Sequence, residues 1–447
     1  MAAQKPSLQD GIDRAGSPVT LLWQQNPDPW LPENIDLEYA GWAEEQAAGH
    51  DSVSLSDLSH HMSDLYIEGP DATRLLAAVS ANNYDKFEIG QAKQFVPVTG
   101  NGHIVTDGIL LREAESKYVL SGIPASQHWV RYHGEKDGYD VAFDEDPSTA
   151  FRGGREPRIF RYQVQGPQAK ALAEKVFQGP LPQAKFFHSV PVSLRGRSLR
   201  ALRHNMSGQD GYEFIGGWDH AKAVKETFLS AGEELGIVHV GAWAYATTSI
   251  ESGWIPSPVP GIYTDPDLED YRRWLPLFGI EGKRPLHGSF YSENIEEYYV
   301  SPWELGYGRS ISFEHDFIGR DALLAAKETV PRTKVTLVLD PEDVSRSDLA
   351  GGGFHLTYSR HRVEADGELA GLTYQTGTIG ALGTMLSLAV IDKRWSAPGT
   401  EVAVIWGDHP GAGIEPDADL GFPRVRATVQ PAPFDQHARR EYRRNEF

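Results

Sequence analysis

The pattern of apolar and polar positions predicts two kinds of region along the chain. Up to residue 333, short β-branched runs alternate with amphipathic stretches of helical period, as in mixed α+β domains. From Lys334 onward the apolar runs are strand-like, at 334–340, 385–392, 400–407 and 424–430, with Gly, Pro and Asp turns between them. We therefore expect an α+β N-terminal part, a linker at 328–333 and a β-rich C-terminal domain.

Four helices are predicted, each after a short strand-like run, at 71–80, 168–178, 220–235 and 320–328. The first two belong to a repeated pattern of strand, Gly-Pro and helix, at Leu65–Ala72 and Tyr162–Ala169. Pro suits the first turn of any helix, so Gly-Pro is good local chemistry at this junction in any protein. The repeat is thus compatible both with duplicated units and with two unrelated turns.

Composition narrows the class of protein. A chain of 447 residues with 40% hydrophobic content can form two or three packed domains. The net charge of -20 repels phosphate backbones and anionic lipid surfaces, so we expect neither a nucleic acid nor a membrane as partner. No stretch approaches the roughly 20 apolar residues that a bilayer requires, and we expect a soluble, cytoplasmic protein. The charged tail, residues 437–447, is expected to be solvated rather than to bind anything.

The inventory of reactive residues excludes several chemistries. The chain has no cysteine, which removes disulfides, thiolate nucleophiles, iron–sulfur clusters and cysteine-ligated zinc. The motifs GxGxxG, GxxxxGK[ST], GxSxG and HExxH are also absent. His60 and His61 precede Asp64, but adjacent histidines on a strand point to opposite faces and cannot easily share one metal. We expect no metal; one histidine would act in a pocket and the other would be structural.

Two segments carry carboxylates among apolar residues. Glu213 follows a run of turn formers and is either a surface residue on a strand or a buried carboxylate that needs donors. The paired N–H groups of a guanidine-like ring, such as a pterin, match a carboxylate in bidentate fashion. In residues 243–258, core packing explains the tryptophans but leaves the Tyr245 hydroxyl and Glu251 in need of partners.

Taken together, these segments resemble the T-protein (aminomethyltransferase) family of glycine cleavage over nearly the whole chain. The similar segments are Asp57–Met62, Ile67–Ala72, Ser207–Glu213, Phe317–Leu323 and Gly380–Val390. A closer resemblance is to its tetrahydrofolate-dependent aryl-ether O-demethylases, at His60–Tyr66, Ala92–Thr99, Glu251–Pro258 and His315–Leu323. The T-protein carries Arg-Asp where this chain has Tyr245-Ala246, and the demethylases carry Tyr. This difference argues against glycine cleavage, and no lipoyl carrier protein is expected as partner.

The resemblance implies an α+β fold with three domains in a ring. Two α+β folate-binding units would be followed by a C-terminal β-barrel or jelly-roll-like domain, with the pterin in a central channel. The expected boundaries are 1–50 with 155–255 for the first folate-binding domain, 51–154 with 256–315 for the second, and 316–447 for the third. Both folate-binding domains would be discontinuous in sequence.

The resemblance also implies roles for individual residues. Tetrahydrofolate would be held by Glu213, with Trp254 packed on it and Gln165 and Tyr212 as further contacts. The catalytic residues would be Tyr245 beside the ether oxygen, His61 facing the aromatic substrate, and Asp107 near the position of the T-protein's catalytic acid.

The substrate pocket departs from the demethylases that act on methoxybenzoates. Their carboxylate-binding Arg aligns with Ile123, and an Arg fork has no apolar substitute. Other polar residues that line the pocket of those demethylases are replaced by apolar ones in this chain. Leu58 stands ahead of the histidines, and Trp30 or Leu31 stands in the N-terminal segment where a Tyr is usual. We therefore expect a small, neutral aromatic ether, either a methoxyarene or a methylenedioxyphenyl lignan such as sesamin, yielding methyl- or methylene-tetrahydrofolate.

Two alternatives belong to other classes. One is an N- or S-demethylase of a small dimethylated metabolite, for which the tryptophan-rich lining would bind a cation. The other is a non-catalytic folate-binding protein on the same scaffold, although such relatives depend on a Cys motif that this chain lacks.

Overall fold

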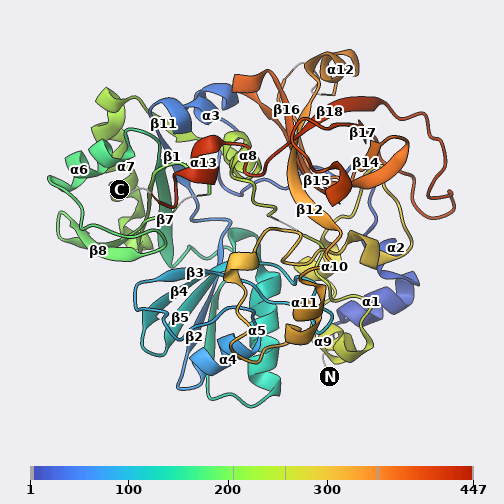
Figure 1. Cartoon of the computed structure of the whole chain (residues 1–447). Helices are drawn as coiled ribbons and strands as arrows, with labels where there is room; N and C mark the ends of the chain where they lie inside the picture. The colour runs from blue at the N-terminus through green and yellow to red at the C-terminus, as the bar shows by residue number, and fades with distance from the viewer. Residues whose placement is uncertain (1–4, 205, 257, 350, 352, 445–447) are drawn as a thin grey trace.

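The computed structural model describes residues 5–204, 206–256, 258–349, 351 and 353–444. Ser257 and the last three residues of the charged tail therefore lie outside the described residues. Three sheets form three lobes around a common centre, with the first sheet at the left of Figure 1, the second below and a barrel at the upper right. The mixed α+β class predicted from the sequence is confirmed.

The first sheet has one apolar and one polar face. Its strand order is β11-β1-β7-β10-β9-β8. The strands are β1 (Val53–Asp57), β7 (Ile159–Gln165), β8 (Ser189–Leu194), β9 (Arg197–Leu202), β10 (Gly211–Gly217) and β11 (Ile237–Val240). Tyr162, Val164 and Phe214 point to one side and form a core with α6 (Ala169–Phe177) and α7 (Ala221–Gly232). Because side chains alternate along a strand, the intervening polar residues face the opposite side.

The second sheet has the strand order β3-β4-β5-β2-β6. Its strands are β2 (Ser63–Glu68), β3 (Ala92–Phe95), β4 (Gly108–Ala114), β5 (Lys117–Gly122) and β6 (Ala142–Asp146). The largest core of the protein includes side chains of α4 (Ala72–Ala78) and α5 (Pro124–Lys136), with Trp129 fully buried. Four further helices belong to this part of the molecule: α1 (Leu8–Ala15), α2 (Pro18–Leu22), α9 (Glu269–Trp274) and α10 (Ile280–Lys283).

The two strand–Gly-Pro–helix segments occupy equivalent places in the two sheets. One joins β2 to α4 and the other joins β7 to α6. Gly69 and Gly166 both have positive φ, at 155° and 118°. A Cβ at either position would lie within 3 Å of a backbone oxygen, of Asp140 and Ser52 respectively, so each turn requires glycine.

The third lobe is a closed barrel. Strands run in the order β15-β14-β17-β18-β12-β16, β15 also pairs with β16, and the short β13 adds to β15. The strands are β12 (Arg332–Leu339), β13 (Leu356–Thr357), β14 (Arg362–Ala365), β15 (Glu368–Ile379), β16 (Thr384–Asp392), β17 (Glu401–Ile405) and β18 (Arg424–Gln430). Helix α11 (Arg320–Ala326) precedes the barrel and α12 (Pro341–Arg346) follows β12. Closure leaves its strands without free edges, and the predicted β-rich domain is confirmed as a barrel.

Strand pairing differs from the expected unit boundaries in two places. Strand β1 pairs with β7 and β11, so it belongs to the first sheet although residues 51–154 were expected in the second unit. Helix α1, expected in the first unit, packs against α9, and the amide of Leu8 bonds the carbonyl of Leu275 at 2.8 Å. The chain therefore crosses from the first sheet to the second at residues 58–62, later than residue 50.

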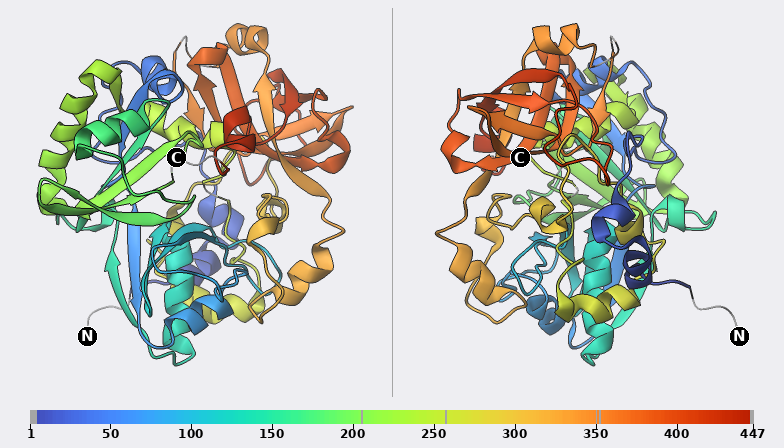
Figure 2. Two further views of the ribbon diagram at one scale, coloured as in Figure 1. Left: turned by 60° about the vertical axis from the view of Figure 1, so that its left-hand side comes forward. Right: turned by 90° about the vertical axis from the view of Figure 1, so that its right-hand side faces the viewer.

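The C-terminal tail docks on the molecule through α13, while the side chains of its described arginines are exposed, as expected for a solvated basic cluster. Helix α13 (Gln436–Arg440) lies where the first lobe meets the barrel (Figure 2). His437 forms an ion pair of 3.3 Å with Asp210, and the Gln209 amide donates to Asp435 at 3.3 Å. No described helix is long and apolar enough to span a bilayer.

Burial of His361 in the barrel makes the stability of the protein dependent on pH. The ring is 3% exposed and packs on Trp406 at 4.6 Å between ring centres, and burial lowers the pKa of His361 to about 3. Between about pH 6.5 and pH 3 the unfolded state binds a proton that the folded state does not, so stability falls as pH falls. We expect the free energy of unfolding to drop by about 1 kcal/mol per pH unit from this residue.

The His361→Phe variant should show a shallower loss of stability than the native protein between pH 6 and pH 4, measured by urea unfolding. A matched control is His220→Phe, because the side chain of His220 is 36% exposed. Identical pH slopes for the native protein and His361→Phe would contradict the assignment.

Candidate active site

His61 and Tyr245 meet at the centre of the candidate site. His61 lies in the crossing segment 58–62, and Tyr245 lies on α8 (Ala242–Ser252). The His61 Nε2 and Tyr245 Oη atoms are 2.9 Å apart, and the Tyr245 hydroxyl also lies 3.2 Å from the sulfur of Met206. The edge of Trp30 approaches His61, with ring centres 5.7 Å apart. The structure thus brings together three residues that the sequence placed in one pocket.

The His61–Tyr245 pair is electrically neutral near pH 7. Burial, assisted by the positive charge of Arg161, lowers the pKa of His61 to about 3. Burial, assisted by the negative charge of Glu213, raises the pKa of Tyr245 well above its usual range. His61 is therefore a neutral imidazole and cannot act as a cationic acid. The available hydrogen-bond donors are the Tyr245 hydroxyl and the imidazole N–H.

An apolar wall lines one side of this pair. Leu58, Val240, Ala244 and Tyr245 form a small buried cluster, on which Met62 and Met206 pack. On the other side, Trp30 is 50% exposed. The carbonyl of Trp30 accepts a hydrogen bond from Tyr358 of the barrel at 3.4 Å. These surfaces suit a flat, apolar ligand with an acceptor atom near Tyr245.

Arg161 joins two buried carboxylates from different sheets. Its Nε lies 3.2 Å from Glu213 of the first sheet, and its NH2 lies 3.0 Å from Asp64 of the second. Ser121 donates its hydroxyl proton to Asp64. All four residues are at most 8% exposed. Burial raises the pKa of Glu213, whereas Arg161 opposes this rise and favours the carboxylate.

The polar face of the first sheet carries buried groups without protein partners. Strand register places Ser54 beside Gln165, and Ser56 and Glu213 on either side of Gln163. The hydroxyls of Ser54 and Ser56, Nε2 of Gln163 and Oε1 of Gln165 are buried and find no hydrogen-bond partner among the described residues. Buried polar groups cost free energy unless they are hydrogen-bonded. This face is therefore suited to a polar, ring-sized ligand with several donors and acceptors.

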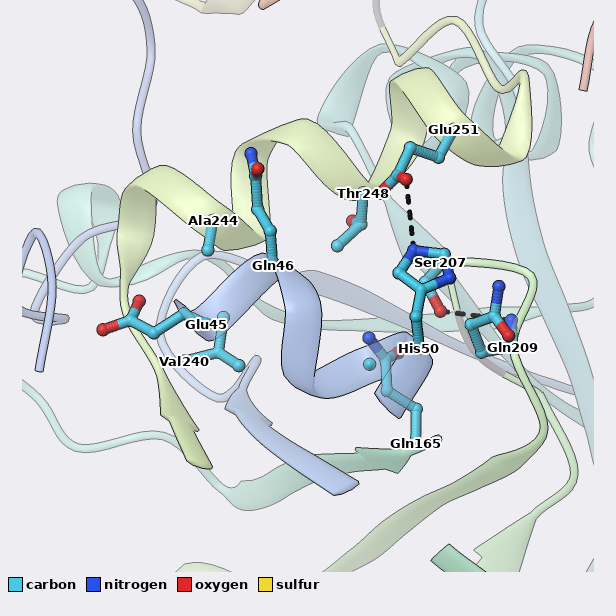
Figure 3. Close-up of a pocket in the computed structure, with 11 residues that line it drawn as sticks. Glu45, Gln46, His50, Gln165, Ser207, Gln209, Val240, Ala244, Thr248 and Glu251 are labelled. Atoms are coloured by element: carbon cyan, nitrogen blue, oxygen red, sulfur yellow. Dashed lines mark hydrogen bonds and ion pairs between the residues drawn. The ribbon is translucent and has the colours of Figure 1, made fainter. Parts of the chain in front are cut away.

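A hollow beside this face lies between α3 (Trp42–Asp51) and α8 (Figure 3). Gln165 lines it, together with His50 and Glu251, whose side chains pair at 3.1 Å. The hydrogen bond to Glu251 raises the pKa of His50. The sequence left Glu251 in need of a partner, and His50 is that partner.

Asp107 belongs to a second cluster. Its carboxylate accepts hydrogen bonds from Gln94 at 2.7 Å and from the indole of Trp254 at 2.9 Å. Burial raises the pKa of Asp107, whereas the hydrogen bonds from Gln94 and Trp254 lower it. Among the described residues, no hydrogen bond links Asp107 to His61 or Tyr245, and the expected acid is paired with Gln94 and Trp254.

Three other residues lie apart from the His61–Tyr245 pair. Tyr212 alternates away from Glu213 and packs in the apolar core with α6, so the two side chains lie on opposite faces of the sheet. His60 lies in a turn, where it bonds Thr149 at 3.1 Å, and is structural. Ile123, which begins α5, is half-buried and packs against the largest core.

The sequence interpretation did not single out Arg161. The signal was present in β7, where Arg161, Gln163 and Gln165 alternate with apolar residues in a strand that is buried on both faces. A buried polar stripe with a single Arg indicates a carboxylate partner or a ligand.

Comparison with known proteins places the chain among one-carbon enzymes. The family model of the GCVT N-terminal domain matches residues 25–257. A syringate O-demethylase from Sphingobium sp. is 35% identical, covering 98% of this chain and 97% of that protein. A sesamin methylene transferase from Sinomonas sp. is 29% identical, covering 84% and 87%. An aminomethyltransferase from Streptomyces coelicolor is 25% identical, covering 82% and 86%.

Among solved structures, the glycine cleavage system aminomethyltransferase T from Bartonella henselae is similar. The TM-score is 0.60 at 17% sequence identity, and the match covers 90% of this chain and 92% of that chain. This likeness confirms the three-domain fold that the sequence predicted.

Replacing Arg161 by Met should destabilise the protein by about 3–5 kcal/mol, because Asp64 and Glu213 would remain buried without a cation. Urea unfolding measures the change, and adding Glu213→Gln to the variant should recover part of the loss. The control is Arg158→Met, since Arg158 pairs with Asp144 at the surface and such pairs contribute at most about 1 kcal/mol. Equal losses in the two single variants would argue against a special role for Arg161.

Proposed function

The chain belongs to the GCVT family, on its aryl-ether demethylase branch, and we propose that it transfers a one-carbon unit from a neutral aromatic ether to tetrahydrofolate. The observation that carries the proposal is the neutral His61–Tyr245 pair, held between a polar sheet face and an apolar wall. The released product would be a phenol or a catechol. As a member of this branch, the protein is a one-carbon transferase.

The pair meets the main chemical demand of ether cleavage. An aryl ether is inert because its leaving group is a basic phenolate, so the departing oxygen needs a proton or a strong hydrogen bond. Tyr245 would donate its hydroxyl hydrogen bond to that oxygen, and His61, bonded to the same hydroxyl at 2.9 Å, would orient it. The proton that the phenol gains would be balanced by the proton that the folate amine loses when it takes up the carbon, so Tyr245 would end the step protonated. Burial of both rings excludes water from the leaving oxygen.

The residues present fit a folate. Glu213 supplies a buried carboxylate for the paired N–H groups of a pterin, and Ser54, Ser56, Gln163 and Gln165 supply buried donors and acceptors. Trp254, whose indole is fixed by Asp107, would pack on the ring. When bound, tetrahydrofolate supplies the amine nitrogen that accepts the carbon.

The apolar character of Ile123, Leu58 and Trp30 supports a substrate without a carboxylate. Both a methoxyarene and a methylenedioxyphenyl compound fit this description. Of the relatives reported above, one is named for a methoxybenzoate, syringate, and the other for a methylenedioxyphenyl compound, sesamin. Methyl transfer and methylene transfer would differ in the folate product formed.

Neither alternative function is favoured by a feature of the site. A dimethylated cation would lie close to Arg161, whose charge already lowers the pKa of His61. A non-catalytic folate-binding role would give no function to the buried His61–Tyr245 pair.

Replacing Tyr245 by Phe should reduce ether turnover at least 100-fold, because the leaving oxygen would lose its donor. The affinity for tetrahydrofolate, measured by tryptophan fluorescence, should change less than threefold. Loss of folate affinity in this variant would instead assign Tyr245 to the cofactor.

A substrate panel tests the predicted class. Neutral methoxyarenes and methylenedioxyarenes should be cleaved with formation of a one-carbon folate, whereas methoxybenzoates should react at least 10-fold more slowly. Mass analysis of the folate distinguishes methyl from methylene transfer. Turnover of dimethylated amines or sulfonium compounds in place of ethers would overturn the proposal.

The role of position 123 can be tested with the same panel. Ile123→Arg should raise kcat/KM for methoxybenzoates relative to neutral ethers by about 10-fold or more, because an Arg fork matches a carboxylate. Ile123→Leu is the control and should leave that ratio unchanged. An unchanged ratio in Ile123→Arg would show that residue 123 does not face the substrate.

A further inference from the structure

The ring of His61 has a single hydrogen-bond partner within the described ranges. Its Nε2 atom lies 2.9 Å from the Tyr245 hydroxyl, whereas its Nδ1 atom is buried and bonds to none of the described residues. A histidine that acts in a site is commonly oriented by a hydrogen bond from its second ring nitrogen to a neighbouring group. The orientation of His61 therefore depends on the backbone that carries it.

That backbone is the 59–61 turn, which Asp57 and Ser59 hold to the first sheet. Asp57 is the last residue of β1, and its Oδ1 atom accepts the Ser59 amide at 3.0 Å and the Ser59 hydroxyl at 2.6 Å. The Ser59 hydroxyl oxygen accepts the amide of Arg161 at 3.0 Å, and the amide of Leu58 donates to the Arg161 carbonyl at 2.8 Å. An Asp that bonds the backbone two residues further on closes a local turn. The start of the turn is thus fixed to the strand that carries Arg161.

The next residue of the turn is held by the second lobe. The His60 carbonyl accepts the amide of Thr149 at 2.7 Å, and His60 Nδ1 lies 3.1 Å from Thr149 Oγ1. Arg152 donates to the same Thr149 oxygen at 2.8 Å and pairs at 2.9 Å with Asp146, the last residue of β6. Two consecutive residues are therefore held from two different sheets, and His61 follows them as the residue that meets Tyr245.

The side chain of Asp57 is fully occupied by protein partners. Asp57 and Ser59 are 7% and 4% exposed. While Oδ1 of Asp57 accepts from Ser59, Oδ2 accepts from Lys225 of α7 at 3.2 Å. A buried carboxylate with a cation and hydrogen-bond donors on both oxygens is satisfied without a ligand. Asp57 is therefore suited to supporting the turn and not to contacting a substrate.

We propose that Asp57 and Ser59 are positioning residues for one-carbon transfer, because they set the 59–61 turn so that the His61 ring meets the Tyr245 hydroxyl. The inference rests on the proposed function, in which that hydroxyl must point at the leaving oxygen. Hydrogen bonds weaken steeply as their angle departs from linearity. A reacting group displaced by about 1 Å can cost about 100-fold in rate. A shifted turn would tilt His61 and release the Tyr245 hydroxyl, while the polar face of the first sheet would stay unchanged.

Ser59→Ala tests this role, because it removes the hydroxyl that joins Asp57 to the Arg161 amide. This variant should lower kcat for ether cleavage about 10-fold or more, with the KM for tetrahydrofolate changed less than about twofold. The split between kcat and KM is expected because the change acts on the His61–Tyr245 pair and not on the groups that would hold the folate.

Ser289→Ala is the matched control. Like Ser59, Ser289 is buried, and its hydroxyl oxygen accepts an arginine amide, that of Arg362, at 2.9 Å. Its hydroxyl also donates to the carbonyl of Ile405 at 2.6 Å. Both variants should lower the urea midpoint, since each leaves a buried amide without its acceptor. Only Ser59→Ala should lower kcat, and equal falls of kcat in the two variants would overturn the inference.

A second measurement reads the position of His61 without turnover. The nitrogen NMR signal of His61 Nε2, in protein isotopically labelled at histidine and assigned with His61→Gln, should shift in Tyr245→Phe because the hydrogen bond is lost. Ser59→Ala should reproduce at least half of that shift, and Ser289→Ala should leave the signal in place. Thr149→Val, at a half-buried position, removes only the side-chain bond to His60 and should shift the signal in the same direction by less.

The outcomes separate this inference from the proposed function. A native His61 signal in Ser59→Ala, whether or not kcat falls, overturns the inference and leaves the proposed function standing. If Ser59→Ala does not fold, a native signal in Thr149→Val overturns the inference in its place. A native protein that cleaves no ether overturns the proposed function, whereas the shifts of the His61 signal still test whether the turn sets the ring.

Discussion

The ion pairs of Arg161 are the interaction on which the rest of the site depends. One guanidinium holds Glu213 of the first sheet and Asp64 of the second, with all three groups buried. Such an arrangement is costly to assemble and more costly to break, because a missing partner leaves a desolvated charge. Burial, assisted by the same charge, lowers the pKa of His61 to about 3. A single residue thus links the two sheets and contributes to the neutral state of the histidine beside Tyr245.

The sequence was sufficient for features that depend on local pattern or on several motifs in a fixed order. The four helices lie within three residues of their predicted ends, and the four strands predicted for the C-terminal domain match in position, because Gly, Pro and apolar period mark them directly. The pairing of His61 with Tyr245 could be expected only through the resemblance. Residues 184 positions apart carry no local signal of contact.

Other features depend on tertiary pairing that no local pattern encodes. The sequence of β1 does not distinguish it from a strand of the second sheet. Only its hydrogen bonds to β7 and β11 assign it to the first sheet. Tyr212 and Glu213 are neighbours in one motif, yet strand alternation sends them to opposite faces. The docking of α13 had no local signal, because the loop on which it docks is more than 200 residues away in sequence.

The crossing segment 58–62 connects the two sheets and also carries His61 and part of the apolar wall beside Tyr245. Leu58 packs in a small cluster of its own, outside the large cores of the two sheets that the segment connects. A substitution at Leu58 alters the wall beside Tyr245 without reaching the cores of the two sheets, whereas a change at Arg161 leaves Asp64 and Glu213 buried without a cation. Under the proposed function, new aromatic substrates would be acquired through this connection while the two sheets stay unchanged.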